Sequence, residues 1–364
     1  MTRVKAATPI GPVTSGRAAW RGPDLAAAHG WVRTLTDSER TEIGDALRHV
    51  QARRVGLGEM TAGDFPLPTL GAALRDVLAE LEDGRGFQVL RGLEVSGYSV
   101  EELRTLYWGL GLHLGTAVSQ SPRHDLIGDV CDLRLPLYGK AGRGYTSNAE
   151  LSYHSDTTDV SVLYCLRTAR TGGESLIASS VEVHNEMIRS RPDLLEVLYL
   201  PIPFALMSEP AADEASWFSA PVFSVTGGHF ASRFSRVLMR NLDFLPGAPR
   251  PTPAQVEAVN VMEEIAADPA FVLEFRMEPG DVQLINSHVT FHNRTAFEDW
   301  PEPERRRHLL RLWLSVPNSR PLSPSLAPVY GDTRPGATRG GAMPHPGQAP
   351  RFTTLPEEPG TTVL

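Results

Sequence analysis

The second half of the chain is broken into short apolar runs, and this feature restricts the fold more than any other. From about residue 114 to residue 316, turns rich in Gly, Pro, Asn and Asp separate the runs. Runs of this length are typical of β-strands, whereas a helix needs a longer periodic stretch. The runs are GTAVSQ, LIGDVCDL, VSVLYCLRT, SLIASS, APVFSV, FVLEFRM, DVQLINS and LLRLWLSV. About eight short strands predict a β-sandwich or a small barrel.

Helical patterns precede and interrupt these runs. In the first of them, Thr36 and Glu39 stand in the positions of a capping box, which is typical of a helix N-terminus. Amphipathic patterns of this kind occur at 36–50, 68–84, from about Ser99 onward, at 181–199 and at 252–269. We therefore expect a mixed α/β fold that is mainly β, with helices flanking the strands.

The chain divides into three parts by pattern but is expected to form a single domain overall. Residues 1–84 are predicted to be a helical N-terminal extension packed on the core. Residues 85–316 contain the strands and two helical insertions. Residues 317–364 are rich in Pro and Gly and are predicted to form an irregular C-terminal wrap or lid.

Composition and charge exclude several classes of function. No apolar run of about 18 residues exists, and the N-terminus lacks the apolar centre of a secretory signal, so we expect no membrane partner. The net charge is -8 and the one basic cluster lies at 304–308, which argues against nucleic acid. Two cysteines, Cys131 and Cys165, are too few for a disulfide framework. A cytoplasmic location and a small-molecule substrate are expected, and assembly into a homo-oligomer stays open.

His154 and Asp156 are separated by one residue in the run AELSYHSDTTDV. Residues i and i+2 of a strand point to the same side, so the imidazole and the carboxylate would converge on one point. Such a pair is common by itself. A third residue, His292, follows a strand introduced by Gly280 and Asp281. Together the three side chains have the composition of a site for non-haem iron, in which two His and one carboxylate leave positions open.

Arg311 interrupts the apolar run LLRLWLSV, nineteen residues after His292. An arginine in a buried strand is unfavourable unless it meets an anion. A 2-oxo acid that chelates iron through two atoms carries a remote carboxylate, and arginine is suited to bind it. Dioxygen would take the remaining position on the metal. Each residue of the set therefore has a role in one mechanism.

These segments resemble those of the taurine dioxygenase (TauD/TfdA-like) family of Fe(II)/2-oxoglutarate-dependent oxygenases. The resemblance extends from about residue 85 to 341 and rests on GFQVLRGL, YHSDTTD, TARTGGESLIASS, PGDVQLINSHVTFHNRTAF, RRRHLLRLWLSV and VYGDTRPGATRGG. The first ~80 residues match no motif of the family. The resemblance implies a double-stranded β-helix (jelly-roll, cupin-like) core, Fe(II) as the metal, and 2-oxoglutarate and O2 as cosubstrates.

The resemblance implies that His154, Asp156 and His292 are the iron ligands and the catalytic centre. Related halogenases replace the carboxylate with alanine or glycine, so the presence of Asp156 favours oxygen transfer. The expected reaction converts 2-oxoglutarate to succinate and CO2 and oxidises a C–H bond. Hydroxylation is the expected outcome, and desaturation, epoxidation and cyclisation stay open.

Further roles follow from the same resemblance. Arg311 matches the arginine that binds the C5 carboxylate of 2-oxoglutarate, with Arg307 as a rival. We prefer Arg311 because it alternates with leucines in the strand, whereas Arg307 follows two other arginines in a predicted loop. Ser175 stands where the family usually has a threonine that holds the cosubstrate. Arg294 is a candidate to support the iron site or to contact substrate.

The substrate pocket is less determined. Glu150, four residues before His154, would favour an amine-bearing substrate if it points inward. Tyr153 and Phe291 are candidates for aromatic walls, and Arg339 is the candidate by which the tail reaches the site. An amino acid or a natural-product intermediate is the expected substrate. The alternative is a non-catalytic β-barrel that binds a metal or a small molecule.

Overall fold

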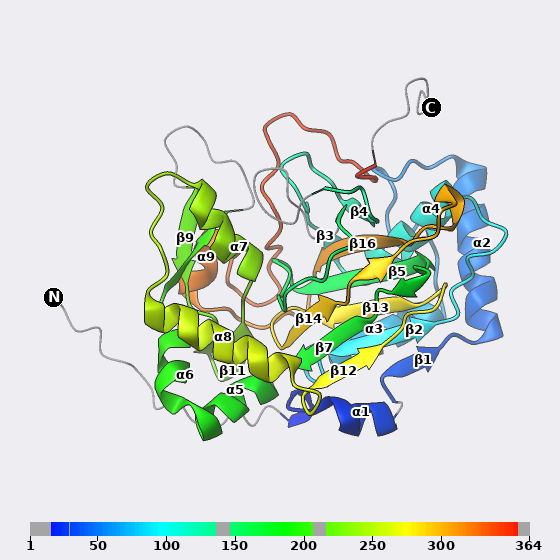
Figure 1. Ribbon diagram of the computed structural model, residues 1–364. Helices are drawn as coiled ribbons and strands as arrows, with labels where there is room; N and C mark the ends of the chain where they lie inside the picture. The colour runs from blue at the N-terminus through cyan, green and yellow to red at the C-terminus, as the bar shows by residue number, and fades with distance from the viewer. Residues whose placement is uncertain (1–15, 29, 136–145, 207–215, 356–364) are drawn as a thin grey trace.

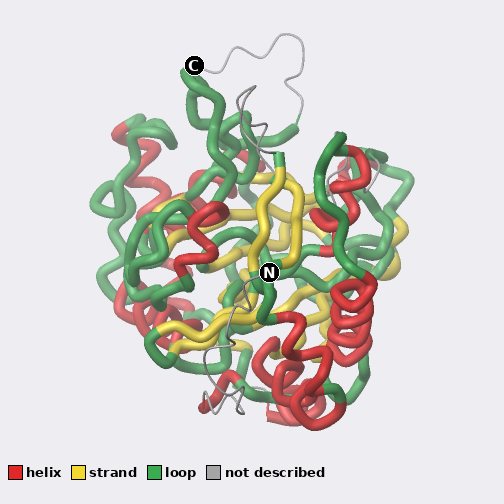
Figure 2. Tube along the Cα trace, turned by 90° about the vertical axis from the view of Figure 1, so that its left-hand side faces the viewer, coloured by secondary structure: helices red, strands yellow, loops and turns green. Residues whose placement is uncertain are grey.

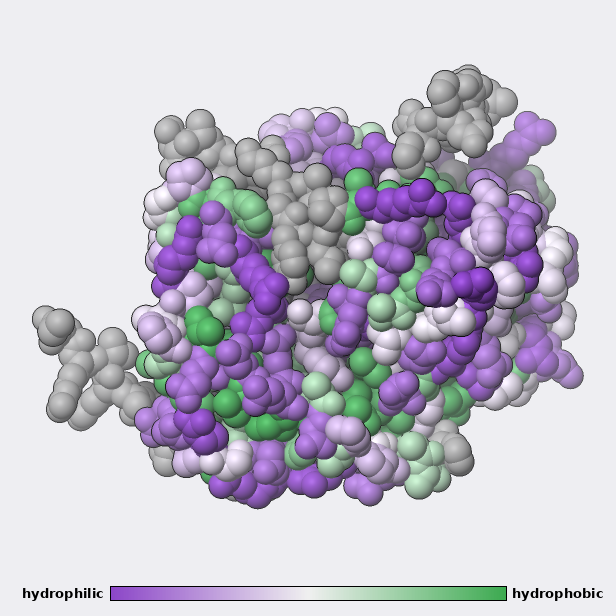
Figure 3. Space-filling model, viewed as in Figure 1, coloured by the Kyte–Doolittle hydropathy of each residue, from purple (hydrophilic) through white to green (hydrophobic). Residues whose placement is uncertain are grey.

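The computed structural model describes residues 16–28, 30–135, 146–206 and 216–355, which form a mixed α/β fold with several sheets (Figure 1). Strands run through the middle of the molecule and helices lie outside them (Figure 2). The face seen in Figure 3 is covered mainly by hydrophilic residues, with smaller apolar areas between them. Among the described residues, no helix is both long enough and apolar enough to cross a membrane.

The largest sheet has seven strands and forms the base on which the site is built. Its order is β1 (Val32–Thr34), β2 (Phe87–Arg91), β13 (Val282–Asn286), β5 (Val160–Arg167), β16 (His308–Ser315) and β3 (Thr116–Ala117), with β4 (Ile127–Val130) also paired to β16. All pairs are antiparallel except β1 with β2. Leu284 at the centre pairs with Gln88 on one side and with Val162 on the other.

A second, three-stranded sheet has the order β12 (Val272–Phe275), β7 (Ser175–Ser179) and β14 (Thr290–Arg294). Three two-stranded antiparallel pairs complete the strands: β8 (Ile202–Ala205) with β9 (Trp217–Ala220), β10 (Phe223–Thr226) with β11 (His229–Ser232), and β6 (Thr171–Gly172) with β15 (Phe297–Glu298). His292 follows β13, as the sequence indicates, and itself lies inside a further strand, β14. The run HVTFHNR has no clear alternation, so its strand was missed.

The longer helices begin at the residues that the sequence patterns predict. Side-chain caps with reciprocal capping boxes are present at Thr36, Ser99 and Thr252. The helices are α1 (Gly22–Ala28), α2 (Asp37–Arg53), α3 (Leu70–Glu82), α4 (Val100–Leu112), α5 (Ser180–Ser190), α6 (Pro192–Leu198), α7 (Arg236–Asn241), α8 (Pro253–Ala267) and α9 (Ala327–Tyr330). Short 3-10 turns occur at Gly16–Ala18, Leu242–Phe244, Pro303–Arg305 and Pro324–Leu326.

Two apolar clusters hold the helices against the strands. Helices α2, α3 and α4 contribute to the first, which packs on the large sheet through residues such as Leu284, Leu310 and Leu312. Helices α5, α6 and α8 contribute to the second, which joins β7 and β14 to the β8–β11 strands. A smaller cluster, with Phe87 and Ile177, joins the two sheets. Burial of each such large side chain contributes about 1.5–3 kcal/mol.

The C-terminal segment is bound to the core by its backbone. The amide of Gly341 donates to the carbonyl of Thr157 at 2.7 Å, and the amide of Ala342 donates to that of Ser119 at 2.7 Å. Farther along, Arg351 forms a parallel bridge with Asp125. The contact at Thr157 brings this segment next to the run that contains His154 and Asp156. The division into 1–84, 85–316 and 317–364 stays a prediction.

Candidate metal centre and active site

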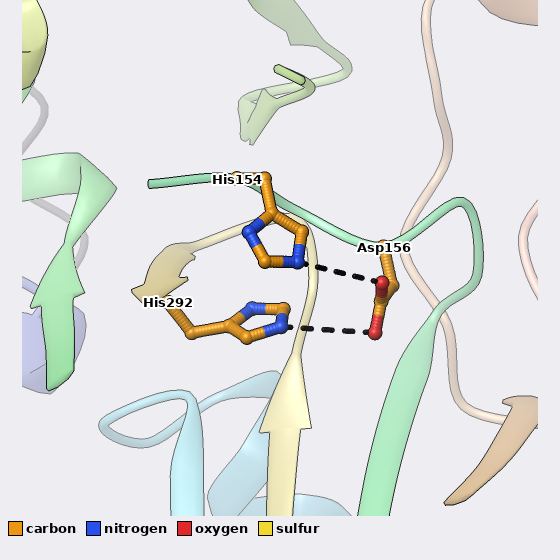
Figure 4. Close-up of side chains that lie close together, drawn as sticks. All are labelled: His154, Asp156 and His292. Atoms are coloured by element: carbon orange, nitrogen blue, oxygen red, sulfur yellow. Dashed lines mark ion pairs between the residues drawn. The ribbon is translucent and has the colours of Figure 1, made fainter. Parts of the chain in front are cut away.

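The structure brings His154, Asp156 and His292 together (Figure 4). His154 lies opposite His292 in an antiparallel bridge, and each backbone amide donates to the other's carbonyl, at 3.0 and 2.9 Å. The two imidazole centroids are therefore 4.2 Å apart. Asp156 follows two residues later and turns its carboxylate toward both rings. One ligand atom from each residue lies within 4.8 Å of the others.

The spacing of these three side chains fits a cation and not a hydrogen-bonded cluster. The Nε2 atom of His154 lies 3.9 Å from Oδ1 of Asp156, and Nε2 of His292 lies 3.8 Å from Oδ2. Both distances are too long for hydrogen bonds. A metal ion held at about 2.0–2.2 Å by each atom would fill the space. Nδ1 of His154 faces the carbonyl of Ser152 at 2.9 Å, which leaves Nε2 available as the ligand.

The charges at the cluster suit metal binding. Burial lowers the pKa of His292 to about 3, and the neighbouring His154 adds to this effect. Burial by itself would raise the pKa of Asp156, but the charges of Arg311 and the two histidines, with a hydrogen bond from Ser161, lower it to about 2. Near neutral pH His292 is thus a neutral imidazole and Asp156 a carboxylate, which are the protonation states that a metal ion requires.

Arg311 is close to the metal ligands. Its Nη1 lies 3.8 Å from Oδ1 of Asp156, and its Nε donates to Oε1 of Gln120 at 2.7 Å. The guanidinium carbon also lies 4.9 Å from the ring centroid of Trp313. Arg311 therefore stands beside the carboxylate of Asp156, and its contact with the distal carboxylate of 2-oxoglutarate stays a prediction.

A second group of cations lies where β14 ends and β16 begins. Arg294 and Arg307 are both buried and stand against the ring of Phe297, at 4.7 and 5.1 Å from its centroid. In the part of the chain that the structure describes, Nη1 of each has no hydrogen-bond partner. Burial lowers the pKa of both, and the charge of Arg307 contributes to bring the pKa of Arg294 to about 9. Ser175 lies directly opposite Arg294 in the β7–β14 register.

The burial of Arg307 differs from the sequence-based expectation of a loop arginine. The residue directly precedes β16, and Gly173, with φ of +79°, allows its side chain to pack close. A Cβ atom at Gly173 would lie 3.3 Å from Nε of Arg307. The alternation with leucines favoured Arg311. That pattern gives no information on an arginine just before a strand, such as Arg307, whose side chain is also buried.

The residues expected to contact substrate do not all reach the metal. Phe291 is fully buried and packs against Phe223 and Phe234, and its contact with a substrate stays a prediction. Tyr153 likewise belongs to the buried apolar cluster beneath the site. Glu150 is exposed. Their identities as aromatic or acidic residues carried no information on which side of the chain they face.

Arg339 is also placed differently from the prediction. Its guanidinium donates to Oδ1 of Asp159 at 2.7 Å and to the carbonyls of Arg320 and Arg334 at 2.7 and 3.1 Å. All three nitrogens are therefore used by the protein itself, and the residue fixes the tail instead of contacting a substrate. The glycines at 340 and 341, taken as a sign of close approach, do make that approach, to the backbone of Thr157 and Ser119.

Sequence reasoning missed two residues near the ligands. Ser161 donates to Oδ2 of Asp156 at 2.5 Å and orients the carboxylate. Arg233 is the largest fully buried side chain and lies one residue before Phe234, whose backbone bonds to Ser155. Arg233 follows β11, and all residues from 230 to 234 are buried, so no alternation in FSVTGGHFASRF marked its burial in the sequence.

Comparison with known proteins agrees with this geometry. Residues 51–313 match the model of the taurine catabolism dioxygenase TauD, TfdA family. FR-33289 synthase of Streptomyces rubellomurinus is 32% identical over 320 residues, covering 87% of this chain and 94% of that protein. The taurine hydroxylase-like protein SAT17 of Stachybotrys chartarum is 29% identical, covering 81% of this chain and 77% of that protein.

Solved structures are similar in fold at lower sequence identity. A structure of asparagine oxygenase with Fe(II), 3-hydroxyasparagine and succinate has a TM-score of 0.60 at 18% identity, over 78% of this chain and 93% of that one. The non-haem iron oxygenase OrfP with Fe and 2-oxoglutarate has a TM-score of 0.58 at 15% identity, with the same coverage of both chains. The chain therefore belongs to the TauD/TfdA family of Fe(II)/2-oxoglutarate-dependent dioxygenases.

Proposed function

We propose that this enzyme hydroxylates a C–H bond of a small molecule that resembles an amino acid or a natural-product intermediate. The balanced reaction is R–H + 2-oxoglutarate + O2 → R–OH + succinate + CO2. The observation that carries the proposal is the cluster of His154, Asp156 and His292, whose ligand atoms converge without hydrogen bonds to each other. Bound iron would supply the activation of O2, and the chain supplies the ligands and the binding groups for both organic molecules.

The proposed iron ligands are Nε2 of His154, Nε2 of His292 and a carboxylate oxygen of Asp156. Ser161 holds Asp156, and the carbonyl of Ser152 holds His154 in the orientation that presents Nε2. Two histidines and one carboxylate occupy one face of the metal, which leaves room for a bidentate 2-oxo acid and O2. This fit supports Fe(II) better than a closed structural zinc site, which uses four protein ligands.

For the distal carboxylate of 2-oxoglutarate we propose Arg307, with Arg294 and Ser175 beside it, in place of Arg311. Arg294 lies two residues beyond His292 on β14, a displacement of about 6.6 Å along the strand. That displacement is comparable with the length of a five-carbon diacid. Two buried arginines with unpartnered Nη1 atoms are unfavourable without an anion between them. Arg311 is then suited to the carboxylate group that chelates the metal next to Asp156.

We further propose that the two sheets are the halves of a double-stranded β-helix. The large sheet contains β5, which follows Asp156, and β16 with Arg311, whereas the three-stranded sheet carries His292 on β14 and Ser175 on β7. In this arrangement the ligands lie between the sheets at one end of the strands. The helices that pack outside each sheet would then keep the barrel closed.

For the substrate, the relatives support a polar small molecule. The structures similar in fold include asparagine oxygenase and OrfP with L-Arg or hydroxylated arginines. Glu150 is exposed beside the ligand run, so an amine group on the substrate is compatible with its position. We propose hydroxylation as the outcome of the reaction, with desaturation, epoxidation and cyclisation as the alternatives.

The function is tested with the full chain under anaerobic conditions. Addition of Fe(II) and 2-oxoglutarate should produce a weak charge-transfer band in the visible region. Exposure to O2 with a panel of amino acids and related acids should yield succinate, and one compound should gain one oxygen atom by mass spectrometry. Absence of both the band and succinate would identify a non-catalytic binding protein. Loss of two hydrogens from the substrate would show desaturation instead.

A further inference from the structure

Arg233 is a buried cation for which the structure supplies no counter-charge. The residue is 2% exposed, and it forms no ion pair in the described parts of the chain. Its Nε and Nη1 atoms are enclosed and have no hydrogen-bond partner. The guanidinium carbon lies 4.5 Å from the ring centroid of Phe204 and 4.7 Å from that of Phe218. Two aromatic rings thus hold a guanidinium whose Nε and Nη1 atoms have no hydrogen-bond partner.

Such an arrangement is unfavourable in the free protein. Transfer of a charge from water to an apolar site is strongly opposed, and cation–π contacts offset only part of the loss. Burial lowers the pKa of Arg233 to about 10, so the side chain is still cationic near neutral pH. A structural arginine would have acquired an acidic partner, as Arg236 nearby has in Glu263. An anion that enters from solvent would remove the penalty.

Arg233 is connected to the metal ligands through its backbone neighbours. The amide of Phe234 donates to the hydroxyl oxygen of Ser155 at 2.9 Å, and the amide of Ser155 donates to the carbonyl of Phe234 at 2.9 Å. The next residue, Ser235, forms an antiparallel bridge with His154. The segment that follows β11 therefore lies directly against the run that carries His154 and Asp156. A group bound at Arg233 would belong to the same active site.

Tyr330 provides a second unpaired polar group from the other side. It lies at the end of α9 in the C-terminal segment, is 2% exposed, and its hydroxyl has no hydrogen-bond partner. Burial raises the pKa of Tyr330, while the charge of Arg233 lowers it and the charge of Asp156 raises it. The ring of Tyr330 also lies 5.4 Å from that of His288, whose carbonyl accepts from the amide of Ser232, the residue before Arg233.

We propose that Arg233 and Tyr330 form a subsite for an oxyanion group of the substrate, such as a carboxylate or a phosphonate. This inference rests on the proposed function, because it gives the dioxygenase an anionic substrate and a point from which the reacting carbon is positioned. Arg233 supplies the charge and donors, and Tyr330 supplies a hydroxyl donor. The aromatic rings of Phe204 and Phe218 hold the guanidinium in place. Arg233 is thus a specificity-determining residue that is separate from the 2-oxoglutarate arginines.

The first test measures anion binding by thermal unfolding. The full chain is loaded with Fe(II) and saturating 2-oxoglutarate without O2, and acetate, methylphosphonate or methanesulfonate is added at constant ionic strength. At least one anion should raise the melting temperature with saturable dependence on its concentration. The rise should be absent in Arg233→Met and present in the control Arg236→Met, which removes an arginine already paired with Glu263. No rise in the wild-type protein, or an equal rise in Arg233→Met, would overturn the proposal.

The unfolding of the variants in the absence of added anion is a second readout. If Arg233 serves a ligand, its replacement by methionine removes an unpaired buried charge, and Arg233→Met should melt at or above the wild-type temperature. A structural role predicts a lower melting temperature, and that result would contradict the proposal. Should Arg233→Met fail to fold, Tyr330→Phe decides: it keeps the ring and should weaken anion binding severalfold. Unchanged anion affinity in Tyr330→Phe would then refute the subsite.

The second test identifies the anion by turnover. Pairs of compounds in which one member lacks the anionic charge, such as an amino acid and its amide or a phosphonate and its diester, are compared by succinate release. The charged member should be preferred in the wild-type enzyme, and the KM for it should rise about tenfold or more in Arg233→Met. Equal use of both members would overturn the inference. The charge-transfer band of wild-type protein with Fe(II) and 2-oxoglutarate is measured separately, so failure of the dioxygenase assignment is distinguished from failure of the subsite.

Discussion

Replacement of Arg307 by alanine should weaken the binding of 2-oxoglutarate by about tenfold to a hundredfold. A charge-assisted hydrogen bond contributes about 1.5–3 kcal/mol, and each 1.4 kcal/mol is a factor of ten in affinity. The structure favours the lower part of this range. Arg294 stands beside Arg307 on the same aromatic ring and would keep part of the positive charge at the site. Arg311→Ala should have a smaller effect on 2-oxoglutarate, because Arg311 lies beside Asp156 instead.

The assay is an anaerobic titration of the Fe(II)-loaded protein with 2-oxoglutarate, followed by the visible charge-transfer band. 2-Oxobutanoate serves as the matched ligand, since it chelates the metal but lacks the distal carboxylate. The wild-type protein should prefer 2-oxoglutarate strongly, and Arg307→Ala should lose most of that preference. Arg311→Ala should bind both acids with a similar relative change. If Arg311→Ala and not Arg307→Ala abolishes the preference, the assignment of the two arginines made here is wrong.

Three further predictions concern the proposed iron ligands, the serine that orients Asp156, and the effect of pH on the stability of the protein. His154→Ala and His292→Ala should each abolish Fe(II)-dependent succinate formation, and wild-type turnover in either would contradict the ligand set. Ser161→Ala should lower Fe(II) affinity by about tenfold, measured by metal titration, because it frees Asp156 to rotate. Burial lowers the pKa of His184 from 6.5 to about 4, so its contribution to stability is complete above pH 6.5 and is lost as the pH falls toward 4. At pH 5 the loss is about 2 kcal/mol. Urea unfolding of His184→Phe should show a correspondingly weaker pH dependence, whereas His49→Gln at an exposed position should not.

The sequence predicted which three side chains come together at the candidate metal centre, because their spacing has a direct geometric meaning. His154 and Asp156 are two residues apart, and the structure turns both toward His292. Helix starts were equally predictable, since a capping box such as Thr36 with Glu39 is a local interaction. The turn at 225–228 also joins two paired strands, β10 and β11, as the Val-Thr-Gly-Gly run indicated.

The arginines were harder to assign, because their roles depend on what surrounds them after folding. Arg307 looked like a loop residue and is buried, whereas Arg339 looked free to reach the site and is fully bonded to the protein. Arg233 attracted no notice among ordinary strand residues. Burial and partner groups decide whether an arginine is structural or available for a ligand, and neither can be read from neighbouring letters. A short parallel strand, Val32–Thr34, was missed for a similar reason.

Asp159 is the point at which the C-terminal segment is fixed to the metal-binding run. The carboxylate is buried three residues after Asp156, and its Oδ1 accepts from Arg339 at 2.7 Å and faces Nε2 of His288 at 2.9 Å. Its Oδ2 accepts from the hydroxyl of Ser315 and the amide of Val316, both at 3.2 Å. Because the same run carries the ligands, a loss of the tail contact should affect both stability and the site.

Arg339→Met should therefore destabilise the protein by about 3 kcal/mol, since removal of one member of a buried ion pair leaves the other charge uncompensated. Because His288 and two further donors still bind Asp159, the loss of stability should lie at the lower end of the range observed when buried ion pairs are broken. Urea unfolding measures it, with Arg334→Met as the control, because Arg334 is 81% exposed and its pair with Asp332 lies at the surface. Limited proteolysis should cleave the segment after residue 317 faster in Arg339→Met. Addition of Asp159→Asn to Arg339→Met should restore part of the stability, because no buried charge then lacks its partner. If Arg339→Met unfolds like the Arg334→Met control, the tail is not held by this ion pair, and the order of Tyr330 at the proposed anion subsite must have another source.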